Sequence, residues 1–118
     1  MNHPSLSLVV LRTANLATTK SFYELIGLRF QFEQHGSGPE HYSTMMGNTL
    51  LELYPLRQPT NIAEPARLGF AVTSLASILA RMETLDIQIV SQPKETEFGT
   101  RAVVVDPDGR RVELEEIP

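Results

Sequence analysis

The apolar and polar positions of this chain follow one pattern twice. In the first half, the apolar run over 6–11 predicts a strand covered on both faces. An apolar stripe over 16–26 predicts a helix, and Asn15 is placed to cap its N-terminus. Three short strands with alternating positions are expected next, over 28–33, 41–46 and 49–54.

The second half repeats this order after a segment over 55–66 that contains several prolines and no period. A strand is expected over 68–72, followed by a helix that Ser74 caps and whose apolar face begins at Leu75. The remaining strands are expected over 87–90, 102–105 and 112–117, with a loop over 96–99 and a turn over 106–109. The sequence thus indicates a repeat of a βαβββ unit, which cannot bury its curved face alone.

Two similar tetrapeptides lie near the ends of the two halves and contain the first candidate site residues. Glu52 lies within 50–53 and Glu113 within 111–114, each in the middle of an apolar, strand-like run. An isolated charge at such a position is costly unless it faces a polar cavity, a cation or a metal. Two glutamates at equivalent points of a repeat therefore suggest a site built between the halves.

Composition narrows the class of protein. The chain has 118 residues, 42% hydrophobic and 20% charged, which is typical of one globular domain with a real core. A net charge of −4 gives no electrostatic footprint for nucleic acid. The absence of cysteine excludes disulfides and thiolate metal sites and is consistent with the cytoplasm. No segment reaches the roughly 18 apolar residues of a membrane span, so no membrane partner is expected, and the run over 6–11 is too short for a signal peptide.

Two motifs resemble those of one known family. The segment 15–28, with Asn15-Leu16 followed by Ser21-Phe22-Tyr23 and Leu25-Ile26-Gly27-Leu28, is similar to "D-L-x-x-S-x-x-F-Y…L-G-L". The segment 106–114 is similar to "D-P-D-G-x-x-[VIL]-E-L". Both are hallmarks of the vicinal-oxygen-chelate superfamily, which includes glyoxalase I, bleomycin-resistance proteins and extradiol dioxygenases.

The resemblance implies a fold. We predict an α+β fold in which two βαβββ modules form a curved mixed sheet around a shared cavity. Residues 1–118 would be a single domain, with module one at 5–54, a linker at 55–66 and module two at 67–118. The resemblance also implies a homodimer.

The resemblance further implies one metal site, to which each module contributes a position on its first strand and one on its fourth. In this chain the four positions are Leu8, Glu52, Arg67 and Glu113. Leucine has no donor atom, and a protonated arginine repels a cation. We therefore favour no cofactor, although a divalent metal held by Glu52, Glu113 and His41 stays an alternative. Arg67 could instead neutralise the glutamates or hold an anionic ligand. An internal ion pair between Glu52 and Arg67, without function, is the other interpretation.

Three further residues are candidates for the same site. Strand alternation places His41 on a face that coincides with that of Glu52 and Tyr54 if the two strands are neighbours. His41 and Tyr54 are thus the catalytic candidates, as donors or proton shuttles. Arg12 lies at alternate positions from Leu8 and is a ligand-binding candidate together with Glu52, Arg67 and Glu113. His35, in the glycine-containing segment 35–39, is expected to be an exposed turn residue.

These observations lead to a functional hypothesis. We expect a cytoplasmic protein that binds a small polar or anionic molecule in its cavity, without the metal of the family. One alternative is a metal-dependent lyase or dioxygenase with a non-standard metal site. A second is a non-catalytic interaction module whose cavity has closed.

Overall fold

The computed structural model describes residues 3–57, 66–97 and 99–117, so most of the predicted linker lies outside the described residues. These residues divide into two compact units that closely follow modules one and two, and each is described by itself. Within the described ranges, no helix is both long and apolar enough to cross a membrane.

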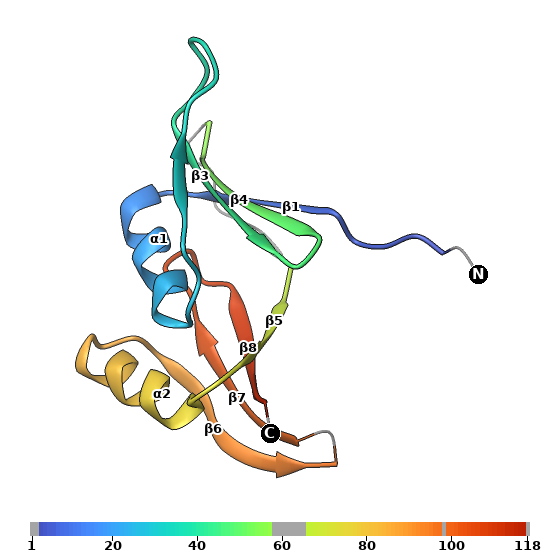
Figure 1. The fold of residues 1–118 in the computed structure, drawn as a ribbon. Coiled ribbons are helices and arrows are strands. Elements are labelled where there is room, and N and C mark those ends of the chain that lie inside the picture. Colours follow the sequence, from blue (N-terminus) through green and yellow to red (C-terminus); the bar gives the residue numbers. More distant parts are fainter. Residues whose placement is uncertain (1–2, 58–65, 98, 118) are drawn as a thin grey trace. The chain divides into compact units, whose positions relative to one another are not determined.

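Module one has the order of elements that the sequence predicts. Strand β4 lies between β1 and β3, and β2 forms the other edge, so the sheet order is β1-β4-β3-β2 (Figure 1). β1 runs parallel to β4, whereas the other neighbours are antiparallel. The elements are β1 (Leu8–Thr13), α1 (Leu16–Leu25), β2 (Gln31–Glu33), β3 (His41–Met46) and β4 (Thr49–Pro55).

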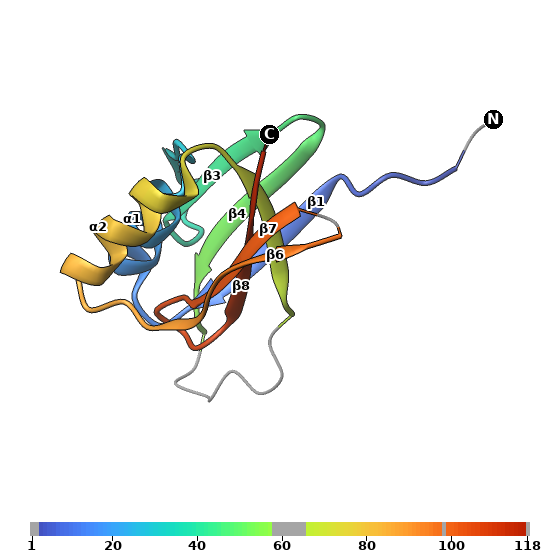
Figure 2. The ribbon, with the colours of Figure 1, turned by 90° about the horizontal axis from the view of Figure 1, so that it is seen from below.

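Module two repeats this topology with the sheet order β5-β8-β7-β6. β5 is parallel to β8, and β7 lies between β8 and β6 in antiparallel pairing (Figure 2). The described residues thus form two four-stranded mixed sheets, which confirms an α+β fold of two βαβββ modules. The shared cavity stays a prediction. The elements are β5 (Leu68–Val72), α2 (Leu75–Thr84), β6 (Ile89–Thr96), β7 (Gly99–Val105) and β8 (Arg111–Glu116).

The two faces of the sheet in module one differ in burial. Leu11, Leu51 and Leu53 are buried on the face where the Thr13 hydroxyl lies 2.6 Å from that of Thr19 in α1. On the opposite face, Leu8 is 49% exposed, so the expectation that the first strand is covered on both faces was wrong. A strand that pairs with one neighbour and packs under one helix needs only one apolar face.

Three strands begin or end at residues other than those predicted, because pairing with residues distant in the sequence determines how far a strand extends. β1 continues to Thr13 because it pairs with β4 as far as Pro55. β2 is shorter than predicted and begins at Gln31, whereas β6 extends to Thr96 and pairs there with Gly99, across the expected loop. Alternation of side chains locates a strand but does not show how far its partner extends.

The two helices begin differently. In α1 the Asn15 side-chain oxygen accepts a hydrogen bond from the Thr18 backbone N–H at 3.0 Å, as predicted. Ser74, in the left-handed conformation with φ 58°, makes no side-chain cap for α2, so that prediction was wrong. The Glu116 carboxylate accepts from the Leu75 N–H at 2.9 Å instead. A carboxylate satisfies an orphan donor and complements the positive end of the helix dipole.

Candidate functional site

A polar row crosses the sheet of module one on the face opposite the buried leucines. Arg12 is paired with Tyr54, and Glu33 is paired with His41. Ser43 is paired with Glu52 in antiparallel strands. Two residues farther along each strand, His41 and Tyr54 therefore lie beside each other. Cross-strand neighbours point to the same face of a sheet, so side chains from four strands meet here.

His41 is the centre of this row. Its side chain is 1% exposed and its ring stacks on that of Tyr54, with centroids 4.2 Å apart and 10° between the planes. His41 Nε2 lies 3.3 Å from the Tyr54 hydroxyl and 3.8 Å from Glu52 Oε2. The Arg12 guanidinium lies 5.1 Å from the centre of the Tyr54 ring. The structure therefore brings together Arg12, His41, Glu52 and Tyr54, all four named from the sequence.

The backbone orients the His41 ring. Nδ1 lies 3.1 Å from the carbonyl oxygen of Pro39. A carbonyl only accepts, so Nδ1 carries a proton and donates it, and Nε2 faces the polar row. A histidine held in this way has one ring nitrogen directed at the site for proton transfer or ligation.

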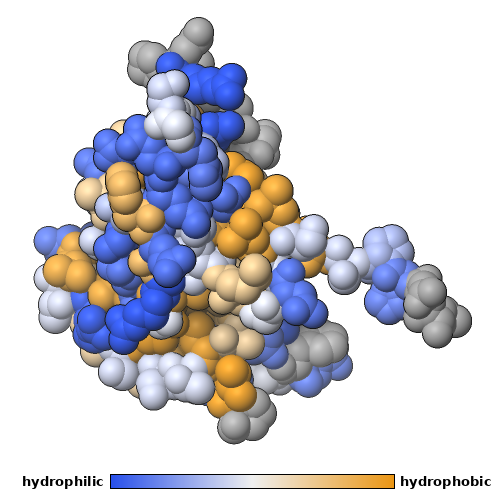
Figure 3. All heavy atoms as spheres, turned by 45° about the horizontal axis from the view of Figure 1, so that its top comes forward, coloured by the Kyte–Doolittle hydropathy of each residue, from blue (hydrophilic) through white to orange (hydrophobic). Residues whose placement is uncertain are grey.

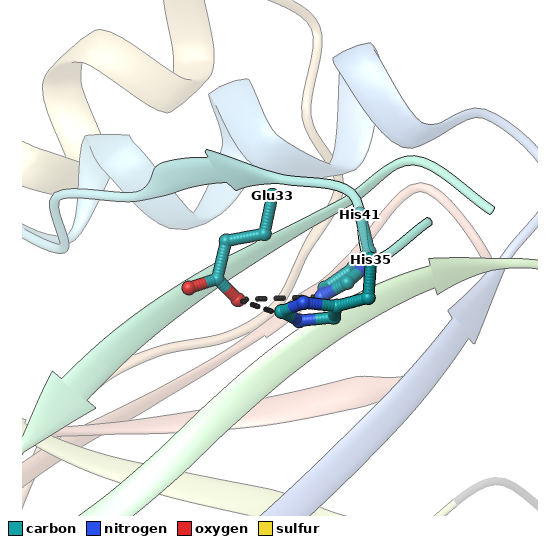
Figure 4. A group of neighbouring side chains, drawn as sticks. All are labelled: Glu33, His35 and His41. Atoms are coloured by element: carbon teal, nitrogen blue, oxygen red, sulfur yellow. Dashed lines mark ion pairs between the residues drawn. The ribbon is translucent and has the colours of Figure 1, made fainter. Parts of the chain in front are cut away.

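Two further residues, Glu33 and His35, lie next to this row, although the sequence had not grouped them with it. Glu33 Oε1 lies 3.3 Å from His41 Nε2 and 4.0 Å from His35 Nε2 (Figure 4). His35 is 75% exposed, as expected for a turn residue, and its ring centre is 5.2 Å from that of His41. Sequence reasoning missed Glu33, although it lies two residues before His35 and directly opposite His41 in the β2–β3 hairpin.

The corresponding face of module two carries arginine in place of histidine. Arg101 Nη1 donates to Glu113 Oε1 at 3.1 Å, and Arg101 Nη2 lies 3.4 Å from Glu115 Oε1. Arg67 is 53% exposed and its Nε lies 3.9 Å from Glu113 Oε2. Arg101 was missed because the sequence indicated a loop immediately before the β-branched run over 102–105.

An open groove in module two lies beside this cluster. Arg101 and Glu113 form part of its wall, and the remaining lining residues are Glu95, Thr96 and Glu97. The carboxylates outnumber the single arginine, so the groove is not by itself a receptor for anions.

The fold and these clusters define the class of protein. A model of the glyoxalase/bleomycin resistance protein/dioxygenase superfamily matches residues 5–114, so the chain belongs to this superfamily. No curated protein matches the chain.

Solved structures with the same fold have varied descriptions. One is a glyoxylase/bleomycin resistance protein/dioxygenase domain from Frankia sp. EAN1pec, with a TM-score of 0.79 and 18% identity over 99% of this chain and 94% of that chain. TnmS3, an antibiotic binding protein from Streptomyces sp. CB03234, has a TM-score of 0.72 and 21% identity over 100% and 99%. An integron cassette protein from the mobile metagenome of V. cholerae has a TM-score of 0.69 and 24% identity over 100% and 98%. At these identities the likeness shows the fold alone.

The residues at the four positions of the family metal do not fit a metal ion. Leu8 offers no donor atom. Glu113 is already hydrogen-bonded by Arg101 and has the Arg67 guanidinium 3.9 Å away. Two permanent positive charges beside the carboxylate oppose a divalent cation there. The chemistry of module two is therefore that of a neutralised carboxylate with an exposed guanidinium next to it.

Proposed function

We propose that this chain binds a small molecule with an anionic or polar group, without a metal at the four family positions. The arrangement around Glu113 carries the proposal. Arg101 already gives Glu113 a hydrogen bond at 3.1 Å, whereas Arg67 lies farther away and is more than half exposed. Since the Arg67 guanidinium is more than half exposed and is the more distant of the two cations from Glu113, we expect it to form charge-assisted hydrogen bonds with an incoming anion.

The polar face of module one, taken by itself, also has the features of a small-molecule site. Leu8, Leu50 and Met45 are paired in one row, of which Leu8 is 49% and Met45 63% exposed. Figure 3 shows such hydrophobic side chains at the surface in orange among hydrophilic ones in blue. Apolar lining with a few placed polar groups is typical of small-molecule sites, and TnmS3, which has the same fold, is an antibiotic binding protein.

Roles for the other candidates follow from their geometry. On module one, Arg12 is the cationic partner offered to a ligand, and Glu52 is a polar anchor beside His41. With its Nδ1 proton directed at Pro39, His41 can accept a proton at Nε2, and Tyr54 can donate one. If the protein is an enzyme, this pair performs the proton transfer. A homodimer in the cytoplasm remains part of the proposal.

A thermal-shift screen tests the anion partner. Small carboxylates and phosphates, each matched with its neutral amide or ester, are added to the protein, and a ligand that binds the folded state raises Tm by mass action. We expect shifts for anionic members that Arg67→Gln removes. Arg81→Gln is the matched control, because Arg81 is an exposed arginine of the same module that lies on α2 rather than on the sheet. The proposal fails if no anion shifts Tm, or if both variants lose the shift equally.

A further inference from the structure

We infer that Glu33, His35 and His41 form a binding site for a divalent transition-metal ion in module one. One ligand atom from each residue lies within 4.8 Å of the other two. All three residues belong to the β2–β3 hairpin and its turn. None of them occupies a family metal position, and the inference is independent of anion binding at Arg67.

The distances are close to those of a bound ion. Ligand atoms about 2.1 Å from a tetrahedral ion are separated from one another by about 3.4 Å. Glu33 Oε1 and His41 Nε2 are already 3.3 Å apart, and Glu33 Oε1 and His35 Nε2 are 4.0 Å apart. The His35 side chain is the most exposed of the three, so a small rotation about its torsions closes the remaining gap without repacking the core.

The surroundings of His41 favour a cation at Nε2. Because Nδ1 donates its proton to Pro39, the neutral ring directs the lone pair of Nε2 toward the Glu33 carboxylate at 3.3 Å and the Glu52 carboxylate at 3.8 Å. The Tyr54 hydroxyl, 3.3 Å from Nε2, can donate a hydrogen bond to this lone pair, and a metal ion bound between Nε2 and Glu33 would in addition offset the repulsion between the lone pair and the carboxylate oxygens. The backbone carbonyl that fixes the tautomer is the usual partner of a metal-bound imidazole.

The donor atoms indicate the class of metal. Two imidazole nitrogens and one carboxylate oxygen suit Zn²⁺ and its neighbours in the first transition row, whereas Mg²⁺ and Ca²⁺ prefer oxygen ligands only. Three protein ligands leave a coordination position for water or for an oxygen of a bound molecule. Glu52 lies close enough to accept a hydrogen bond from a group in that position.

Calorimetric titration of the untagged chain with Zn²⁺, without any anionic ligand, tests the site. We expect one ion per chain, with affinity lowered at least about tenfold by Glu33→Gln and by His35→Gln. Glu40→Gln and His3→Gln are the matched controls, because both residues are exposed and outside the cluster. His41 is not substituted, since its side chain is buried. Circular dichroism confirms that each variant is folded.

Co²⁺ provides a spectroscopic readout of the same site. Co²⁺ bound by two imidazoles and a carboxylate absorbs visible light, and the Glu33→Gln/His35→Gln double variant is expected to lose this absorption. Mg²⁺ at the same concentration should give no heat. The inference is overturned if Zn²⁺ binds the double variant as tightly as the natural chain, if only His3→Gln weakens binding, or if no ion binds.

Discussion

The two modules share one backbone plan but carry different basic side chains at equivalent places. Ser43 pairs with Glu52 in module one, and Val103 pairs with Glu113 in module two. His41 lies two residues before Ser43, and Arg101 lies two residues before Val103. His41 and Arg101 therefore occupy the same position of the repeat. A buried imidazole faces one glutamate, and a guanidinium faces the other.

The same comparison extends to the neighbouring strands. Glu33 pairs with His41, whereas Lys94 pairs with Arg101. Module one thus places an imidazole beside two carboxylates, Glu33 and Glu52, whereas module two places a guanidinium beside Glu113 and Glu115. The apolar face of each sheet is similar in both modules, because it must bury the core. The polar face is not constrained in this way, so one fold can present a histidine cluster on one module and an arginine cluster on the other.

The turns between the last two strands of each module also differ. In module one, a two-residue turn begins with Gly47 at φ +58°. In module two, Asp106 Oδ1 accepts hydrogen bonds from the backbone N–H groups of Asp108 at 2.9 Å and Arg110 at 3.0 Å. The Arg110 side chain donates to Asp106 Oδ2 at 3.1 Å, and these two side chains are 4% and 0% exposed.

The largest expected effect comes from breaking this buried pair. Asp106→Ala leaves the Arg110 charge buried without its main partner and removes the side-chain acceptor of two backbone N–H groups, so we expect a loss of about 3–5 kcal/mol in the free energy of unfolding. Asn48→Ala in the exposed turn of module one should change it by less than about 0.5 kcal/mol. Urea denaturation measures both. Equal effects would show that the two turns contribute alike.

The sequence predicted the fold and much of the polar face, because both depend on local alternation and on a repeat. Adjacent strands joined by a short turn share faces, so His41, Glu52 and Tyr54 could be grouped before the structure was known. Glu33 could not, because its position opposite His41 depends on the register of a hairpin with a longer turn. Glu116 was missed as a cap for a related reason, since it lies 41 residues from Leu75 along the chain.

The two helix N-termini also differ between the modules, and substitutions there should change the free energy of unfolding less than Asp106→Ala does. Asn15→Ala removes a neutral side-chain cap and should cost about 1 kcal/mol at any ionic strength. Glu116→Ala removes a charged side-chain cap and should cost about 0.5–1 kcal/mol. This cost should be smaller in high salt, because salt screens the interaction between the carboxylate and the helix dipole. Ser74→Ala should be close to neutral. Thermal unfolding at low and high salt checks all three, and a large loss in Ser74→Ala would contradict the assignment of Glu116 as the cap.

The residues that follow the two helices are expected to give effects of opposite sign, and the gain in Asp86→Gly is the smallest expected change. Gly27 follows α1 with φ +113°, and Asp86 occupies the equivalent place after α2 with φ +57°. A positive φ costs glycine nothing and costs other residues conformational energy. Asp86→Gly should therefore raise the free energy of unfolding by about 0.5 kcal/mol, whereas Gly27→Ala should lower it by about 1 kcal/mol or more.

Differential scanning calorimetry of the two variants measures these opposite signs under one set of conditions. The loss of unfolded-state restriction in Asp86→Gly works against the gain, so the net stabilisation is expected to be small. Asp86→Ala is the control, because alanine retains the strain of the positive φ while it removes the carboxylate. If Asp86→Ala is as stable as Asp86→Gly, the carboxylate rather than the backbone conformation sets the cost at this position. The difference between the two helix ends would then be one of charge.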